Sequence, residues 1–457
     1  MGMELWIGMI SPWIGGIMIG MSKRSCRKGI IASGIVWIIM TRELVKRIRE
    51  ERKVEERIEN IGYEIGVDGM SIGFMWLTSV LISVSILSEY RKEKGSQEQL
   101  LIMEGILLEV FSVRDIIGFY ISYEGVLIPM IMMVGRGGSR ERRIRAVYML
   151  IIYTLVGSMI MLMGIIVMYV SVGSTSYEVL MNVEYKEGIG KWLWWSIMIS
   201  MMIKMPLIPV HVWLPEVHAE APTVGSVMLA GIMLKMGGYG MLRIGIGMLS
   251  EESVYNSPVI YTMSVISGIY GGMSTISQID WKKIIAYSSI VHMGMVGVGM
   301  YSMRREGYSG SIMMMISHGI ISSGMFMIVG MMYERYKTRI IKYYSGMEEG
   351  MPIMSRIMWM LCMGNMGVPL TSGYVSEMWI MWGIMSVSKE IGVMMSISMI
   401  LTVVYTIWMY NRVYKGIKKE YIKKEMDISR REYNSISPLV VIMIIMGVKP
   451  SIWSEVW

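Results

Sequence analysis

Apolar residues fill long runs of this chain, and short polar stretches separate the runs. Because a hydrocarbon core about 30 Å thick needs roughly 20 apolar residues per helical span, each run predicts one membrane helix. The rule predicts about fourteen spans, over residues 4–21, 27–42, 68–88, 98–113, 115–134, 146–171, 191–209, 223–248, 257–278, 283–301, 309–333, 355–385, 390–411 and 436–454. This pattern is typical of an all-α polytopic membrane protein.

Some of the apolar regions are interrupted. Arg114 and Asp115 cut a region too long for one span, which predicts two helices joined by a tight polar turn. Pro206 and Pro209 break one span, and GVPLTSG breaks another about five spans later. Broken spans at corresponding places in two halves are typical of inverted repeats with polar sites near the membrane midplane.

The formal net charge of +8 comes from basic residues in the connections between runs. Alternate connections are the basic ones, namely SKRSCRK, RGGSRERRIR, ERYKTRIIK and NRVYKGIKKEYIKK. Such asymmetry sets membrane orientation and attracts anionic lipids such as cardiolipin, so it does not indicate a nucleic-acid partner. With an even number of spans, both termini are expected on the opposite side, the intermembrane space of a mitochondrion. The mixed-charge stretch from Arg42 to Arg57 predicts a solvated helix outside the bilayer.

Composition narrows the class further. The chain has 57 Met but 4 Phe, a skew that suggests an organellar genome, although Met and Ile still supply apolar surface. Cys26 and Cys362 form neither a disulfide framework nor the spacing of an iron–sulfur site. Phosphate-loop and dinucleotide motifs are missing from the sequence, so we expect no redox cofactor on this chain. The first run lacks the features of a cleaved leader and is expected to remain as a span.

Six ionisable side chains lie well inside the apolar runs. A charge near the bilayer centre costs about 2.5–3.5 kcal/mol on insertion scales, so such residues are functional candidates by default. They are Glu124, Lys204, Lys235, His292, His318 and Glu377. These residue types indicate a proton relay, because imidazole titrates near neutrality and carboxyl and amine groups exchange protons.

Each candidate also has a structural interpretation. Glu124 is either a neutral hydrogen-bonding carboxyl or the partner of Lys204 in an ion pair, whose opening and closing would change how tightly the lysine holds its proton. Lys235, in GIMLKMGGYG, either extends to the interface or lies deep beside closely packed small residues. Either histidine alone is as readily a satisfied polar contact as a functional group.

The broken segment HVWLPEVH holds a second set of polar residues. His211, His218, Glu216 and Glu220 offer the donor types of a zinc site. Helix-borne ligands need regular spacing, however, and Pro215 argues against a regular helix here. A metal centre is therefore the weaker interpretation, and a polar pocket inside the membrane is the stronger one.

The motifs around these residues resemble a known family. The longest motif is KMPLIPVHVWLPEVHAEAPTVGSVMLAGIMLK, and the others are GVDGMS, YEGVLIPM, RAVYMLIIYTLVGS, DWKKIIAYSSIVHMGMV, SHGIISSGMF, YERYKTRIIKYYSG and GVPLTSGYVSE. They are similar to the antiporter-like membrane subunits of proton-pumping NADH:ubiquinone oxidoreductase (respiratory complex I) and of Mrp cation/proton antiporters. With glutamate at position 377, the chain resembles one subunit type of this family, whereas other members have lysine at the corresponding position.

The resemblance implies an antiporter-like fold with two inverted five-helix repeats that contain broken helices. The implied roles are a charge pair of Glu124 and Lys204, a connecting Lys235, His292 and His318 on a polar axis, and a terminal carboxylate at Glu377. The predicted divisions are N-terminal helices and loop (1–97), a first antiporter-like half (98–248), a second half (257–411), and a loop with a C-terminal helix (412–457).

The implied activity is proton translocation across the mitochondrial inner membrane, coupled to NADH:ubiquinone oxidoreduction in other subunits. Those subunits would hold NADH, FMN, iron–sulfur clusters and ubiquinone, and the implied partners are other membrane-arm subunits, especially neighbouring antiporter-like ones. Two alternatives remain open. In the first, the chain is a subunit of an Mrp-type antiporter without a redox partner. In the second, it is a structural scaffold whose charges hold helices together.

Overall fold

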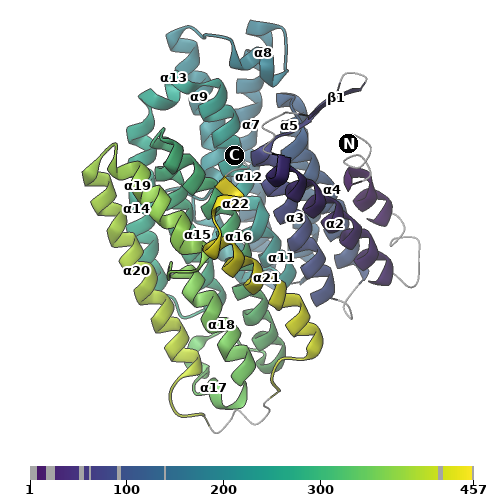
Figure 1. Ribbon diagram of the computed structural model, residues 1–457, viewed down its shortest axis with the longest axis vertical. Helices are drawn as coiled ribbons and strands as arrows, with labels where there is room; N and C mark the ends of the chain where they lie inside the picture. The colour runs from purple at the N-terminus through teal and green to yellow at the C-terminus, as the bar shows by residue number, and fades with distance from the viewer. Residues whose placement is uncertain are drawn as a thin grey trace. The chain divides into compact units, whose positions relative to one another are not determined.

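The computed structural model describes residues 8–16, 26–50, 56–60, 63–89, 94–137, 140–419 and 426–454, and these residues are mainly helical (Figure 1). Within them, nine helical stretches are long and apolar enough to cross a membrane. They are α3 (Gly69–Ser88), α5 with α6 (Ile116–Arg136), most of α7 (Arg142–Val172), α11 to η2 (Thr223–Ile246), α14 (Ser257–Ser277), α15 (Trp281–Tyr301), α16 (Arg305–Tyr336), α20 (Lys389–Tyr414) and α21 (Arg430–Val448). Each overlaps a predicted span.

Further helices occupy predicted apolar runs but are shorter, broken or more charged. They are α2 (Cys26–Glu50), α4 (Lys94–Ser112), α9 (Glu187–Lys204), α18 (Pro352–Asn365) and α19 (Ser372–Met385). The predicted break between α18 and α19 is confirmed, because residues 366–371 are not helical. Half of the first predicted span lies outside the described residues, and residues 8–16, the described half, are helical.

Short elements connect these helices, namely α8 (Tyr177–Met181), α10 (Trp213–Glu220), α13 (Ser250–Tyr255), η3 (Ile341–Tyr343) and α17 (Met347–Gly350). A further short helix, α22 (Ser451–Ser454), follows α21. The predicted polar turn between α4 and α5 (Ile116–Gly125) is confirmed, because Arg114 and Asp115 lie between the two helices. The guanidinium of Arg114 is 3.4 Å from the carboxylate of Glu178 in α8, so the turn is tied to a neighbouring loop.

A β-hairpin departs from the all-α prediction. Strand β1 (Glu56–Asn60) pairs antiparallel with β2 (Tyr63–Val67), in a register that sets Ile58 opposite Ile65. The solvated helix predicted from Arg42 to Arg57 is therefore wrong at its end. Helix α2 is described as far as Glu50, and residues 51–55 lie outside the described residues. Glu56 and Arg57 belong to strand β1, where they find backbone partners in a hairpin rather than in a helix.

The chain divides into two compact units. The first unit comprises Met1–Met205, Ile232–Ser257 and Ile452–Trp457, and the second comprises Pro206–Gly231 and Pro258–Ser451. The segment after the proline break therefore belongs to the second unit. The chain returns to the first unit before it reaches Lys235.

An aromatic cluster lies in the core of the first unit. The rings of Phe74 and Phe111 stack with centroids 5.3 Å apart, and the ring of Tyr239 meets both edge-on at 5.9 and 5.2 Å. Phe119 extends the cluster toward Tyr123, with centroids 5.4 Å apart. Three of the chain's 4 Phe thus gather here, while Met, Ile and Leu fill most of the remaining core.

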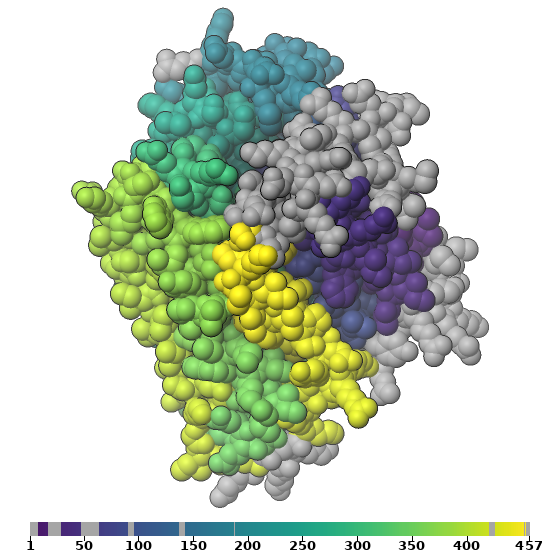
Figure 2. All heavy atoms as spheres, viewed as in Figure 1, coloured from purple at the N-terminus to yellow at the C-terminus, as the bar shows by residue number. Residues whose placement is uncertain are grey.

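Helix α16 is the central helix of the second unit. It packs against α11 (Thr223–Met228), α15, α18, α19 and α21, and its apolar part is wholly buried. The outer helices α20 and α21, coloured yellow-green and yellow in Figure 2, present apolar side chains on their exposed faces instead. Continuous apolar surface on long helices is what a lipid-facing side requires.

Candidate functional site

Lys204 is the last residue of α9 and its side chain is buried, with the residue 3% exposed. The helix ends here because Pro206 cannot continue it and forces the preceding residue out of helical geometry. The ammonium donates a hydrogen bond to the carbonyl of Tyr123 at 2.6 Å and lies 3.1 Å from the centroid of that tyrosine's ring. A carbonyl, an aromatic face and a helix C-terminus together compensate the buried positive charge.

Glu124 follows Tyr123 in α5 and is partly buried. Its Oε1 is buried without a hydrogen-bond partner among the described residues. The carboxylate acts electrostatically on Lys204, but within that same part of the chain the two groups form no ion pair. The predicted pair is therefore open in this structure, and its closing stays a prediction.

Lys235 lies in α12 (Leu234–Gly240), between the π-helical turns η1 (Leu229–Met233) and η2 (Met241–Ile246). The residue is 0% exposed, so the side chain does not extend to an interface. Gly237 shows how closely α12 approaches α9. A Cβ there would stand 2.7 Å from the amide nitrogen of Met205 and 2.8 Å from the carbonyl oxygen of Met201. The predicted close packing of small residues is confirmed, and it sets the helix of Lys235 against the end that carries Lys204.

A second cluster forms inside the second unit from four helices. His292 of α15 lies with its ring centroid 5.4 Å from that of His318 on α16. The Nδ1 of His292 is 3.9 Å from Oε1 of Glu377 on α19, and its Nε2 is 3.1 Å from Oδ1 of Asn365 on α18. All four residues are almost fully buried. The structure thus brings the three predicted residues of this unit together and adds an amide.

The break between α18 and α19 supplies the wall behind Glu377. Gly367, at the start of the break, has φ +65°, a conformation that costs L-residues other than glycine. A Cβ at this position would overlap the carboxylate of Glu377. Glycine is therefore needed both for the turn and for the close approach of the carboxyl group.

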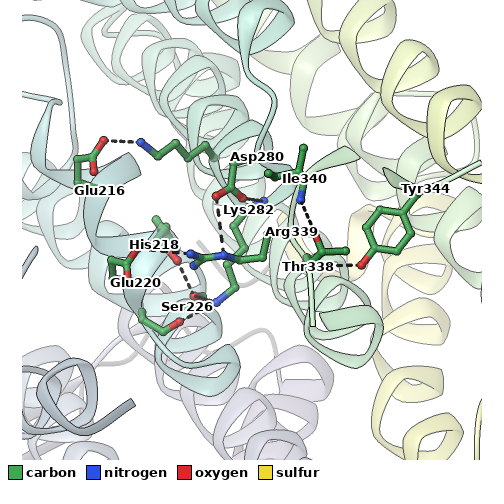
Figure 3. A network of polar contacts seen from close by, with 12 residues as sticks. Glu216, His218, Glu220, Ser226, Asp280, Lys282, Thr338, Arg339, Ile340 and Tyr344 are labelled. Atoms are coloured by element: carbon green, nitrogen blue, oxygen red, sulfur yellow. Dashed lines mark hydrogen bonds and ion pairs between the residues drawn. The ribbon is translucent and has the colours of Figure 1, made fainter. Parts of the chain in front are cut away.

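A third polar cluster connects α10 with the start of α15 and with the residues that follow α16 (Figure 3). The guanidinium of Arg339 lies 3.4 Å from a carboxylate oxygen of Glu220 and 3.8 Å from one of Asp280. Lys282 donates to the carbonyl of Ala221 at 2.6 Å. Burial raises the pKa of the Asp280 carboxyl above its usual range, and the positive charge of Arg339 opposes that rise.

The same cluster corrects one prediction. Residues Trp213–Glu220 form a regular short helix, α10, so the argument that Pro215 prevents one is wrong. Proline in the first turn removes an amide that has no helical partner in any case. A carboxylate oxygen of Glu216, near the start of α10, is 2.5 Å from Nζ of Lys283. Lys283 therefore binds one end of α10, and Arg339, through Glu220, binds the other.

The four residues weighed as zinc ligands face different neighbours. Glu216 and Glu220 bind Lys283 and Arg339, the ring of His218 stacks on Phe326 at 4.7 Å, and His211 lies edge-on to Tyr270 at 6.2 Å. In the described ranges, three His, Cys, Asp or Glu side chains do not converge anywhere to hold an ion.

Sequence reasoning missed three residues of these clusters, namely Tyr123, Asn365 and Tyr405. None of them is charged, so a search for costly intramembrane charges passes over them. Tyr123 directly precedes Glu124, and its hydroxyl is 3.3 Å from Oγ of Ser200 on the helix of Lys204. A buried amide next to a break was the signal available for Asn365, the last residue of α18. Tyr405 lies inside the continuous helix α20, where no local signal marks it.

The chain matches the model of a family described as NADH:quinone oxidoreductase/Mrp antiporter, transmembrane, over residues 113–402. NADH-ubiquinone oxidoreductase chain 4 of Chondrus crispus is 43% identical over 397 residues, which cover 86% of this chain and 81% of that protein. The chain 4 of Marchantia polymorpha is 43% identical over 401 residues, covering 87% and 81%. That of Arabidopsis thaliana is 41% identical over 402 residues, with the same coverage of 87% and 81%.

Solved structures match the fold over nearly the whole chain. A chain of respiratory complex I from Thermus thermophilus with bound NADH superimposes with a TM-score of 0.91 at 23% identity, covering 98% of this chain and 96% of that one. A chain of the Mrp complex from Dietzia sp. DQ12-45-1b gives a TM-score of 0.90 at 15% identity, covering 100% and 96%.

Proposed function

Because this chain belongs to the NADH:quinone oxidoreductase/Mrp antiporter transmembrane family, we propose that it is the proton-translocating chain 4 subunit of an NADH:ubiquinone oxidoreductase in the mitochondrial inner membrane. The observation that carries the proposal is the 41–43% identity to curated chain 4 proteins over more than four fifths of the chain. The buried ionisable clusters of both units support it, since ionisable groups are costly inside a membrane and are functional candidates where they occur.

In this proposal each unit carries part of one proton relay. The first part is Glu124, Lys204 and Lys235, and the second is His292, His318 and Glu377. Opening and closing of the Glu124–Lys204 pair changes the proton affinity of the lysine, and the imidazoles pass protons near neutral pH. The fold is built from fourteen spans, as two inverted five-helix repeats with broken helices within 98–248 and 257–411, flanked by 1–97 and 412–457.

The driving reaction lies outside this chain. NADH, FMN, iron–sulfur clusters and ubiquinone belong to partner subunits, and this chain holds no redox group. Neighbouring antiporter-like subunits of the membrane arm and anionic lipids such as cardiolipin complete its surroundings. The chain contributes to the enzyme by moving protons. Changes of charge elsewhere in the complex shift the balance between the open and closed states of the Glu124–Lys204 pair.

The test is replacement of Glu124 by Gln and of Lys204 by Ala in the intact complex, reconstituted in liposomes. Both variants are expected to assemble, and to lose most proton pumping together with the coupled quinone reductase activity. Glu251→Gln, which changes an exposed acid of the first unit, is the matched control and should pump normally. Full coupled turnover in either assembled variant at 124 or 204 would contradict the relay.

The likeness in fold to a chain of an Mrp complex keeps a second function in view, a cation/proton antiporter subunit without a redox partner. A mass-spectrometric inventory of the purified membrane complex separates the two. Co-purification with NADH-oxidising, iron–sulfur and quinone-binding subunits supports chain 4. A scaffold role would appear as neutral replacements that lower assembly but leave pumping intact.

A further inference from the structure

Asn365 is a buried amide in the cluster of the second unit, 3% exposed at the end of α18. Its Oδ1 lies 3.1 Å from Nε2 of His292, whose other ring nitrogen faces the Glu377 carboxyl at 3.9 Å. The imidazole therefore stands between an amide and a carboxyl. Both of its nitrogens face groups that take part in hydrogen bonding.

An amide has two different ends, and each end fixes a different form of the imidazole. When Oδ1 faces the ring, Nε2 must carry a hydrogen to donate, so in the neutral ring Nδ1 is a base that faces Glu377. When the amide is turned by 180°, its Nδ2–H donates to Nε2, and the hydrogen of the neutral ring sits on Nδ1. Which end faces His292 thus decides whether Nδ1 accepts a proton from Glu377 or donates a hydrogen bond to it.

The surroundings permit both orientations of the amide. The phenol of Tyr405, on α20, lies beside Asn365 and close to Glu377. The amide nitrogen of Asn365 and the hydroxyl of Tyr405 are both buried, and neither has a partner at full hydrogen-bond geometry in the described residues. A phenol both donates and accepts, so it can face the amide nitrogen in one orientation and the amide oxygen in the other.

We propose that Asn365 is a positioning residue that sets the tautomer of His292 and turns over as a proton crosses the ring. The inference rests on the proposed function, because it takes Glu377 to be a proton carrier. Neutral Glu377 gives its proton to Nδ1 while Nε2–H donates to Oδ1, which leaves a carboxylate and an imidazolium. Nε2 then releases its proton to water or to the imidazole of His318, and the amide turns to donate to the bare Nε2. One proton has passed through the ring and the net charge is unchanged, with a negative charge left on Glu377 and a positive charge on the group that accepts the proton from Nε2.

The titratable groups that face His292 define what the test must hold constant. Among the described residues, His318 on α16 and Glu377 on α19 face the imidazole, and Tyr405 on α20 lies beside Asn365 and close to Glu377. A substitution at 365 changes none of these three residues, but it also removes the amide beside the phenol of Tyr405. Because Glu377 and His318 stay the same, shifts of opposite sign in the pH profiles of two variants at 365 report on the imidazole that the amide contacts.

The experiment compares two substitutions in the intact, reconstituted complex, with protons pumped per NADH oxidised measured across pH 5.5 to 9. Asn365→Leu removes the acceptor that stabilises the imidazolium, so the alkaline limb of the pumping profile should move to lower pH by about one unit. Asn365→Asp places a carboxylate beside Nε2, and the same limb should move to higher pH by about one unit. Ser372→Ala is the matched control, because it removes a buried hydrogen bond of 2.7 Å to Ser317 without touching the imidazole.

Shifts of opposite sign at position 365, with an unmoved profile in Ser372→Ala, support the inference. Profiles that coincide with wild type in both variants overturn it, as does an equal shift in the control. If Asn365→Leu fails to assemble, Asn365→Asp still decides, because it keeps the volume of the side chain. Glu377→Gln is measured in parallel: lost pumping there with wild-type profiles at 365 refutes only the inference, whereas full pumping there refutes the relay itself.

Discussion

Replacing Lys204 by Met separates the stability role of this lysine from its role in proton transfer. The hydrogen bond of the ammonium to the Tyr123 carbonyl and its contact with the ring contribute about 4 kcal/mol together, from typical values for charged hydrogen bonds and desolvated cation–π pairs. Keeping an ammonium away from water costs several kcal/mol, on the same order. Methionine fills nearly the same volume without that cost, so the free energy of unfolding should change by no more than about 1–2 kcal/mol.

Lys204→Ala is the informative contrast. It removes the same charge but also most of the stem of a side chain that is only 3% exposed, and truncation of a buried long side chain typically costs about 2–5 kcal/mol because a cavity remains. We therefore expect Lys204→Met to assemble with a wild-type thermal midpoint and Lys204→Ala to assemble with a lower one. Both should fail to pump, since neither side chain can hold a proton.

The assay combines thermal dissociation of the purified complex, followed on native gels, with dye-monitored acidification of liposomes. Proton pumping by Lys204→Met at wild-type stoichiometry would show that the ammonium is not on the path. A midpoint for Lys204→Met as low as that for Lys204→Ala would refute the energy argument instead, because the contacts to Tyr123 would then outweigh the desolvation cost. Pumping therefore tests whether the ammonium is on the proton path, and the thermal midpoint separately tests the energy argument.

Other substitutions test the geometry around the clusters. Gly367→Ala should reduce pumping at least tenfold, since its Cβ would displace the Glu377 carboxyl. The control is Gly173→Ala, which is also at positive φ but has open space around it, so it should cost only the backbone strain of about 1 kcal/mol. Equal pumping in the two variants would contradict this prediction. Gly237→Ala should lower the thermal midpoint by the equivalent of about 1–3 kcal/mol, because α12 must move away from α9, and an unchanged midpoint would show that the helices are not in contact. A double-mutant cycle of Arg339→Gln and Glu220→Gln should give a coupling energy of about 1–3 kcal/mol for this partly buried pair, and strictly additive effects would show that the two charges do not interact.

Much of the helical framework could be predicted because its cause is local. A run of about 20 apolar residues is expected to cross the bilayer as a helix, and a pair of prolines or a charged pair inside it favours a break. The breaks at Pro206, at Arg114 with Asp115, and between α18 and α19 were all found in this way. The family, indicated by long motifs, was also found and is confirmed by the match over 113–402.

What escaped prediction depends on contacts between distant residues. The buried ammonium of Lys204 takes a backbone carbonyl and a ring as partners rather than the carboxylate of Glu124, and no pattern in one chain reveals a carbonyl as a partner. Asn365 escaped because it is neutral and the search weighed only charges. The hairpin of β1 and β2 escaped because its mixed charges are as compatible with a solvated helix.

Two of the buried ionisable groups, Lys204 and Glu377, lie at helix breaks for a physical reason. A regular helix satisfies its own backbone groups, whereas a helix that ends inside a membrane exposes carbonyls or amides that need polar partners. Lys204 occupies the last turn of α9, where its charge complements the carbonyl end of the helix. The carboxyl of Glu377 lies against the Gly367 backbone in the break before α19. At these two positions the break therefore supplies polar backbone that helps to stabilise a titratable group inside the membrane, through the carbonyl end of α9 at Lys204 and the backbone at Gly367 beside Glu377.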